Sequence, residues 1–349
     1  MLNVVSFGEF LGLMLVTVIL LSLGLTGALR HYALKNSLID VPNARSSHSV
    51  PTPRGGGVAI VVSFLVVLPL FALAGLATWH QVWGLLGAGA LIAIVGFLDD
   101  HGHIAARWRL LAHFISAVWA LFWMGGLPSI SVFGVSLDIG WIGHILAALY
   151  LVWMLNLYNF MDGIDGLAGI EAVTATLGAC LVYWLTGTDS LVWTPLLLAA
   201  AVLGFFCWNF PPAKIFMGDA GSGFLGIILG ILSLQAAWSD PRMLWVWLIL
   251  LGVFIVDATF TLVRRLMRGD KVYEAHRSHG YQFASRQFGK HLPVTLAVGA
   301  INLFWLLPLA LSVVLLRVDG AVALILAYLP LIALAYKFRS GELERPDGC

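Results

Sequence analysis

Long apolar runs constrain this chain more than any other feature of its sequence. A helix needs about 20 apolar residues to cross the hydrocarbon core of a bilayer, and runs of that length recur along the 349 residues. The chain is 60% hydrophobic and 11% charged, whereas soluble domains carry about 25% charged residues. The alternation typical of membrane barrel strands is missing from these runs. The sequence therefore predicts an all-α, polytopic integral membrane protein.

The runs divide the chain into eleven predicted transmembrane helices. We expect residues 1–349 to form one membrane-embedded domain. The first run lacks a preceding basic segment and a following cleavage site, so we interpret it as a retained span rather than a signal peptide. The spans are placed near residues 8–29, 57–78, 83–99, 108–125, 140–158, 168–186, 191–208, 221–238, 243–263, 293–316 and 319–337.

The distribution of basic residues predicts how the chain is oriented. Of the 19 Lys and Arg residues, all except Arg242 and Arg317 lie in or beside segments that follow odd-numbered spans, or in the C-terminal tail. Because cytoplasmic segments are enriched in Lys and Arg, we predict a periplasmic N-terminus and a cytoplasmic C-terminus. The predicted cytoplasmic loops are residues 31–56, 99–107, 159–167, 209–220 and 264–292.

Acidic and carboxamide side chains gather where spans meet these loops. Asn156, Asn159, Asp162 and Asp165 follow one another at intervals of three, which would place them on one face if the backbone there is helical. An ordinary helix end with glycine turns is the alternative for this stretch taken alone. The first interpretation predicts an acidic, hydrogen-bonding face at the membrane boundary.

Three further acidic residues predict a metal ion. Asp99 and Asp100 are adjacent at the end of a span, where like charges repel and oppose the helix dipole, so a cation beside them is expected. Asp219 follows two prolines and begins the next glycine-rich span; it could simply cap that helix, but with the other acids on one membrane side we interpret it as a ligand. Mg²⁺ takes oxygen ligands and pairs with substrate phosphates.

Basic and aromatic side chains in the same loops indicate anion recognition. Guanidinium groups bind phosphates, and an aromatic ring can stack on a base, although a basic loop that only anchors the chain at the membrane remains an alternative for the first loop. A zinc site is disfavoured because no cysteine lies near the histidines, and we interpret Asp257, inside a span, as structural. The binding candidates are Arg45, Arg54, Lys214, Phe216, His276, Arg277 and His279.

Together these groups predict a site for Mg²⁺ and phosphate at the membrane surface. Carboxylates would hold the metal, and the metal and cations would neutralise a diphosphate, because positioning and electrostatics supply most of the catalysis in phosphoryl transfer. A water-soluble donor would enter from the cytoplasm and a lipid acceptor from the bilayer. Nothing in the pattern indicates a nucleic-acid partner.

Five stretches in this order carry a family resemblance: PNARSSHSVPTPRGGG, GFLDD, NFMDGIDGLAG, NFPPAKIFMGDAGSG and HRSHGYQ. They resemble the polyprenyl-phosphate N-acetylhexosamine-1-phosphate transferases over about residues 40–282. The resemblance implies transfer of a sugar 1-phosphate from a UDP-sugar to undecaprenyl phosphate, release of UMP, dependence on Mg²⁺ or Mn²⁺, and a bacterial inner-membrane location with a cytoplasmic active site. It leaves open whether the protein is a homodimer.

The resemblance also assigns roles by position. It implies that Asp99 and Asp100 are the aspartate pair, Asp99 as base or partner of the lipid phosphate and Asp100 beside the metal. Asp219 matches the metal-binding aspartate. The remaining matches are Asn159, Asp162 and Asp165 near nucleotide and diphosphate, Asn209 and Phe216 on the uridine side, and His276, Arg277 and His279 in the loop that helps to choose the sugar.

The last loop departs from two branches of that family. HRSHGYQ differs from the loops of the phospho-MurNAc-pentapeptide and common-antigen branches and looks more like O-antigen-initiating enzymes that use UDP-N-acetyl-6-deoxyhexosamines, such as UDP-N-acetylfucosamine or UDP-N-acetylquinovosamine. UDP-GlcNAc is the alternative donor. The rival classes are a cation-coupled transporter, whose carboxylates would be expected near the bilayer midplane, and a non-catalytic scaffold.

Overall fold

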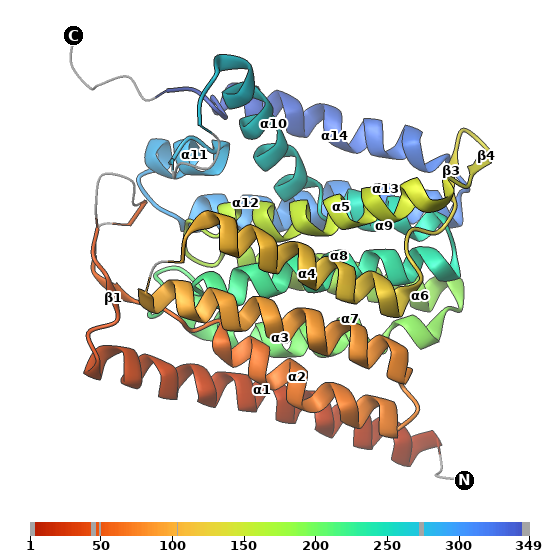
Figure 1. The fold of residues 1–349 in the computed structure, drawn as a ribbon, viewed down its shortest axis with the longest axis horizontal. Helices are drawn as coiled ribbons and strands as arrows, with labels where there is room; N and C mark the ends of the chain where they lie inside the picture. The colour runs from red at the N-terminus through yellow and green to blue at the C-terminus, as the bar shows by residue number, and fades with distance from the viewer. Residues whose placement is uncertain (1–3, 43–46, 49, 103, 272–275, 344–349) are drawn as a thin grey trace.

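The computed structural model describes residues 4–42, 47–48, 50–102, 104–271 and 276–343, and it is mostly helical (Figure 1). Most helices lie along a common direction, as expected for a bundle that crosses a bilayer. The α-helices are α1 (Val4–Lys35), α2 (Val58–Leu73), α3 (Trp79–Gly102), α4 (Ala106–Met124), α5 (Gly140–Met161), α6 (Leu167–Thr186), α7 (Trp193–Asn209), α8 (Asp219–Ser239), α9 (Arg242–Leu250), α10 (Gly252–Arg268), α11 (Gly280–Phe288), α12 (Leu292–Ile301), α13 (Leu307–Leu315) and α14 (Gly320–Lys337).

Every predicted span coincides with a helix or a helix pair. Within the described residues, eight helices are long and apolar enough to cross a membrane, and α9 with α10 makes a ninth span if the bent pair is counted as one. The helix α2, of 16 residues, is a shorter apolar helix. The structure therefore confirms a helical, polytopic membrane architecture, and the number eleven stays a prediction.

Several details differ from the predicted spans. The first helix continues beyond residue 29 to Lys35. The run predicted as one span at 243–263 is broken between α9 and α10, which meet at an angle of 74°. A π-helical turn, Asn302–Leu306, joins α12 to α13. The last predicted loop contains the short helix α11, which the sequence interpretation did not include.

Two short antiparallel hairpins accompany the helices. In the first predicted loop, β1 (Ile39–Asp40) pairs with β2 (Thr52–Pro53), with Ile39 opposite Pro53. Between α4 and α5, β3 (Ile130–Val132) pairs with β4 (Val135–Leu137). The two hairpins lie at opposite ends of the bundle (Figure 1).

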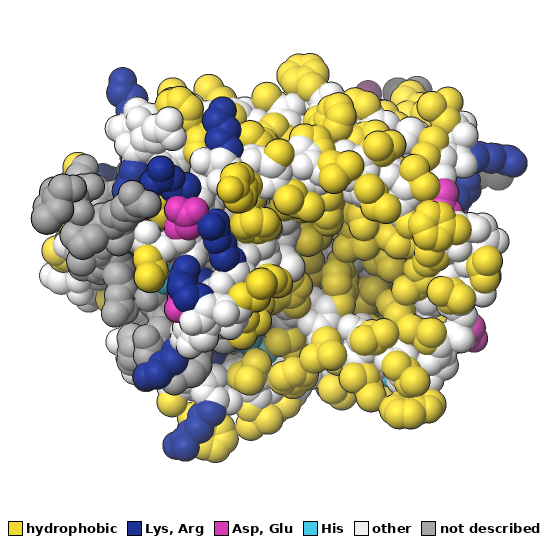
Figure 2. All heavy atoms as spheres, turned by 90° about the horizontal axis from the view of Figure 1, so that it is seen from above, with side chains coloured by type: hydrophobic (Ala, Val, Ile, Leu, Met, Phe, Trp, Pro, Cys, Tyr) yellow, Lys and Arg dark blue, Asp and Glu magenta, His cyan; other side chains and the backbone are white. Residues whose placement is uncertain are grey.

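The helix α8 forms the centre of the bundle. Nearly all of its residues are buried, and it packs against α3 and α5, while α1 lies outside against α7. Hydrophobic side chains cover the middle of the molecular surface, and most of the visible Lys and Arg side chains gather at the end where α11 lies (Figure 2). This is the distribution expected for a protein with a lipid-facing belt and one basic surface.

Glycine lets α3 and α8 approach closely beside their charged ends. A Cβ added at Gly96 would lie 2.5 Å from the backbone nitrogen of Ala220, and one at Gly57 would lie 2.5 Å from Cα of Gly221. Real side-chain carbons do not come so close to backbone atoms, so a larger residue must push the helices apart. The glycines of these motifs therefore set the spacing of the acidic helix ends.

We expect Gly96→Ala to lower stability by about 1–3 kcal/mol, the usual effect of overpacking a close contact. The melting temperature of the purified protein in detergent would measure the change. Gly84→Ala is the matched control, because an added Cβ at this position of α3 would make an ordinary contact 3.4 Å from Trp123. Equal melting temperatures for both variants would contradict the role of Gly96.

Candidate functional site

Four of the predicted cytoplasmic loops meet at one end of the bundle through hydrogen bonds between their described residues. The amide of Gly56 donates to the carbonyl of Phe216 at 2.9 Å, and the hydroxyl of Tyr281 donates to the carbonyl of Phe160 at 2.9 Å. His291 Nε2 lies 2.9 Å from the carbonyl oxygen of Ser47. Segments far apart in the sequence thus form one surface, as their shared basic character predicts.

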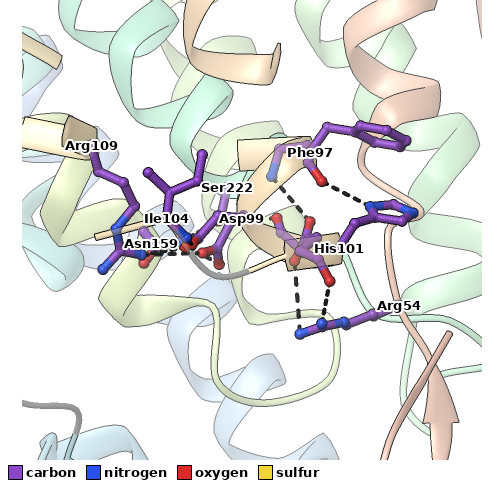
Figure 3. A network of polar contacts seen from close by, with 12 residues as sticks. Arg54, Phe97, Asp99, His101, Ile104, Arg109, Asn159 and Ser222 are labelled. Carbon is purple, nitrogen blue, oxygen red and sulfur yellow. Dashed lines mark hydrogen bonds and ion pairs between the residues drawn. The ribbon is translucent and has the colours of Figure 1, made fainter. Parts of the chain in front are cut away.

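Asp99, Asp100, Asp162 and Asp219 form the acidic site. Asp99 and Asp100 lie in the last turn of α3, and Asp219 begins α8. Asp99 accepts a hydrogen bond from the amide of Ile104 at 2.7 Å and pairs with Arg109 at 2.5 Å. The same Arg109 Nη1 lies 3.8 Å from Asp219 Oδ2. Figure 3 shows Arg109 and Asn159 beside Asp99. One guanidinium therefore bridges carboxylates from two helices.

Asp100 points toward the first loop and the start of α8. Its side chain is 7% exposed and lies 4.0 Å from the guanidinium of Arg54, which also donates to the Asp100 carbonyl. The amide of Ala220 lies 3.5 Å from Asp100 Oδ2. The helix N-terminus and Arg54 both place positive charge next to this buried carboxylate.

The stretch from Asn156 to Asp165 is not one helical face. The helix α5 ends at Met161, so only the two asparagines are helical and Asp162 and Asp165 lie in the loop that follows. Asn159 Nδ2 donates to Asp219 Oδ1 and to Ser222 Oγ, both at 2.9 Å. Gly166, the N-cap of the next helix α6, has a positive φ of 72°, which L residues adopt only with strain.

The two loop aspartates differ in their charge environment. Burial raises the pKa of Asp162 well above its usual range, and the neighbouring Asp219, Asp100 and Asp165 carboxylates raise it further. Burial also acts to raise the pKa of Asp165, but hydrogen bonds from His291 and the Ala213 amide outweigh it, so that the pKa is lowered. His291 Nδ1 lies 3.1 Å from Asp165 Oδ1. Asp162 is thus set to hold a proton and Asp165 to stay ionised.

A cavity of about 440 Å³ opens beside the acidic site. Asp99, Arg109, Asn159 and Asp219 line its polar part, and His276 and His279 lie on its wall. The wall also includes apolar side chains from three helices: Ile92, Val95, Leu110 and Leu155. The cavity can therefore hold a molecule that is charged in one part and apolar in another.

The two histidines on that wall are neutral at physiological pH. Burial lowers the pKa of His276 to about 3, with His279 beside it, and burial with nearby Arg265 lowers the pKa of His279 to about 3. Their rings are 4.9 Å apart. Neutral imidazoles can both donate and accept hydrogen bonds, which suits sugar hydroxyls better than phosphate.

The other predicted residues lie around this site with different surroundings. Asn209 is buried, and its carboxamide donates to the carbonyl of Ile215 and accepts from the amide of Gly166, each at 3.0 Å. Phe216 packs edge-on against His48, and Lys214 is exposed above the Trp208 ring. The carbonyl of Arg277 accepts a hydrogen bond from Arg286. Arg45 lies outside the described residues.

Asp257 has the structural role expected of it. Its carboxylate accepts hydrogen bonds from the amides of Gly280 and Tyr281 at 2.8 and 2.9 Å and from the hydroxyl of Ser340 at 3.0 Å. These contacts fix the N-terminus of α11 and thereby the histidines before it.

The carboxylates of the acidic site could supply some, but not all, of the ligands of a Mg²⁺ ion. The described residues contain no group of three or more His, Cys, Asp or Glu side chains arranged around a metal position. Mg²⁺, however, is usually held by one or two carboxylates and completed by waters and substrate phosphates. Asp219 and Asp100 meet that smaller requirement, so the residues fit a metal that arrives with a phosphorylated substrate.

Sequence reasoning missed two charged residues of this surface. Arg109 was counted only as a basic residue at a span edge, although it lies ten positions after Asp99 at the start of the next helix. His291 stands alone before α12 in a stretch with no motif. Only the position of Arg109 after an acidic pair could have indicated it; nothing near His291 predicted its partner.

Comparison with known proteins gives consistent similarities. Residues 82–237 match the family model described as glycosyl transferase family 4. The chain is 31% identical over 262 residues to a probable undecaprenyl-phosphate N-acetylglucosaminyl 1-phosphate transferase of Bacillus subtilis, covering 73% of this chain and 72% of that protein.

Two further relatives extend the comparison. An undecaprenyl-phosphate α-N-acetylglucosaminyl 1-phosphate transferase of Thermotoga maritima is 28% identical, over 83% of this chain and 88% of the relative. A phospho-N-acetylmuramoyl-pentapeptide-transferase of Moorella thermoacetica is 32% identical, over 53% of this chain and 61% of the relative. The four aspartates of the acidic site all lie within residues 82–237, the range that the family model matches.

Proposed function

Since the chain belongs to the polyprenyl-phosphate hexosamine-1-phosphate transferases of glycosyl transferase family 4, we propose that it transfers an N-acetylhexosamine 1-phosphate from a UDP-sugar to undecaprenyl phosphate. The observation that carries this proposal is that Asp99 and Asp219 of the acidic site line, with Arg109 and Asn159, a cavity that is charged in one part and apolar in another. A diphosphate fits the charged part, and the apolar part suits an isoprenoid chain.

The transfer exchanges one phosphorus–oxygen bond for another. An oxygen of the lipid phosphate attacks the phosphorus next to the sugar, and the bond from that phosphorus to the UMP oxygen breaks, so UMP leaves with the electron pair. Asp219 and Asp100 would hold Mg²⁺, which neutralises charge on the diphosphate. Asp99 would orient the lipid phosphate, and Arg54 would add positive charge from the first loop.

The location follows from the same proposal. The acidic site lies at the end of the bundle where Lys and Arg gather, which supports a cytoplasmic active site in the bacterial inner membrane, with eleven crossings and a periplasmic N-terminus. A UDP-sugar would then reach the site from the cytoplasm. A transporter is disfavoured because these carboxylates lie at helix ends on one side of the bundle.

For the donor, we propose an N-acetyl-6-deoxyhexosamine on the sequence of the last loop, for initiation of an O-antigen or a related envelope glycan. The neutral histidines of that loop line the cavity and can distinguish sugars by hydroxyl contacts. UDP-GlcNAc is the second candidate, which the names of the two relatives from Bacillus subtilis and Thermotoga maritima favour.

We expect the purified protein to release UMP only when undecaprenyl phosphate, Mg²⁺ and one UDP-N-acetylhexosamine are all present. The assay uses UDP-N-acetylfucosamine, UDP-N-acetylquinovosamine and UDP-GlcNAc in parallel, and the donor that gives the highest kcat/KM identifies the sugar. In the two controls, one without the lipid phosphate and one with added EDTA, no UMP should be released. Absence of UMP with every donor, from folded protein, would refute the proposed reaction.

A further inference from the structure

Arg109 occupies an unusual position in the acidic site. Its guanidinium pairs with Asp99 and lies 3.8 Å from Asp219, although Asp219 is the carboxylate proposed to hold the metal. Its Nε is buried and has no hydrogen-bond partner among the described residues. Two carboxylates therefore hold the guanidinium, while its buried Nε–H group has no acceptor among the described residues. Leaving a buried donor without an acceptor costs free energy.

The Arg109 guanidinium lies between the carboxylates of Asp99 and Asp219 and offsets their repulsion, as a bound metal ion would. Asp99 and Asp219 come from α3 and α8, whose close packing at Gly96 brings the two carboxylates together. Like charges in such a position repel, and a cation between them offsets the repulsion. A divalent cation at Asp219 would lie a few ångströms from the guanidinium and would be repelled by it.

We propose that Arg109 is a positioning residue that serves as an internal substitute cation. It holds Asp99 and Asp219 in place before substrate arrives, and it moves away from Asp219 when a divalent cation binds with the donor diphosphate. This inference rests on the proposed function. It implies that metal alone binds weakly and that metal and UDP-sugar bind together, since the diphosphate supplies both metal ligands and an acceptor for the guanidinium.

The test is the affinity of the purified protein for Mn²⁺ without substrate, measured by electron paramagnetic resonance of the free ion. We expect Arg109→Gln to bind Mn²⁺ about tenfold more tightly than the wild-type protein, because partly exposed charges at this separation interact modestly. Arg107→Gln is the matched control: Arg107 is exposed on the same helix, over the Trp108 ring, and its loss removes the same charge.

The outcomes separate the inference from the proposed function. Equal or weaker Mn²⁺ binding by Arg109→Gln than by Arg107→Gln overturns the role of Arg109 and leaves the reaction standing. Absence of Mn²⁺ binding by every protein, even with UDP-N-acetylfucosamine, UDP-N-acetylquinovosamine or UDP-GlcNAc present, overturns both the inference and the metal dependence of the reaction. If Arg109→Gln does not fold, Arg109→Met keeps the apolar stem and makes the same comparison.

Discussion

Asp219→Asn is expected to lower turnover by about a hundredfold or more while the protein stays folded. The variant keeps the shape of the side chain and can still accept the hydrogen bond that Asn159 donates to Asp219, but it removes a full negative charge from the position proposed to hold Mg²⁺. Because the side chain is 40% exposed, the lost charge affects a ligand that enters from solvent more than it affects packing. The rate of UMP release at saturating donor and Mg²⁺ measures the change.

The other end of the same helix provides the control. Asp240 follows α8 and pairs with Arg242 at 2.6 Å, so Asp240→Asn makes the same chemical change far from the acidic site. We expect this variant to keep near-normal turnover and the two variants to melt within a few degrees of each other. Near-full activity of Asp219→Asn would exclude Asp219 as the metal ligand.

The helical architecture was predictable because it depends on properties that each run of sequence carries by itself. An apolar run of about 20 residues must be helical in lipid to satisfy its backbone, and all eleven predicted runs contain helices. The bend between α9 and α10 was not predictable in this way. Their sequence remains apolar through Leu250, Leu251 and Gly252, so the break depends on packing against other helices rather than on a local signal.

The acidic residues of the site were predictable because they are charged groups at the ends of apolar spans. Asp99, Asp100 and Asp219 are costly beside hydrocarbon, and this alone marked them. The prediction of one helical face from Asn156 to Asp165 was wrong for Asp162 and Asp165, because α5 ends at Met161. A spacing of three residues does not by itself show whether the backbone continues as a helix or turns. Arg109 was missed since a basic residue at a span end is ordinary, and Asp219, one of its two partners, is far away in sequence.

His291→Ala is expected to destabilise the protein by about 3–5 kcal/mol, the usual range when one partner of a buried ion pair is removed. Its ring links the carbonyl of Ser47 to the carboxylate of Asp165, and Asp165 in turn accepts from the amide of Ala213 at 3.0 Å. Three loops and the start of α12 meet through this one imidazole. Melting temperatures of the wild type and the variant across a pH series measure the loss.

The pH dependence has a definite sign. Burial acts to lower the pKa of His291, but the bond to Asp165 outweighs it and raises the pKa, while the pKa of Asp165 is lowered. The stabilisation should be complete between the ordinary values of about 4 for Asp and 6.5 for His. It should be lost as the pH rises through the raised pKa of His291, and as the pH falls through the lowered pKa of Asp165.

A neighbouring hydroxyl distinguishes this ion pair from a general loosening of the loop. Thr295 donates to the backbone carbonyl of Asp165 at 2.7 Å, and Thr295→Val removes that uncharged bond, at a cost of about 1 kcal/mol that should not vary with pH. Contributions from groups elsewhere in the protein largely cancel when each variant is compared with the wild type. If the effect of His291→Ala is as independent of pH as that of Thr295→Val, then His291 acts as a neutral hydrogen-bonding group and the loops are not held together by charge.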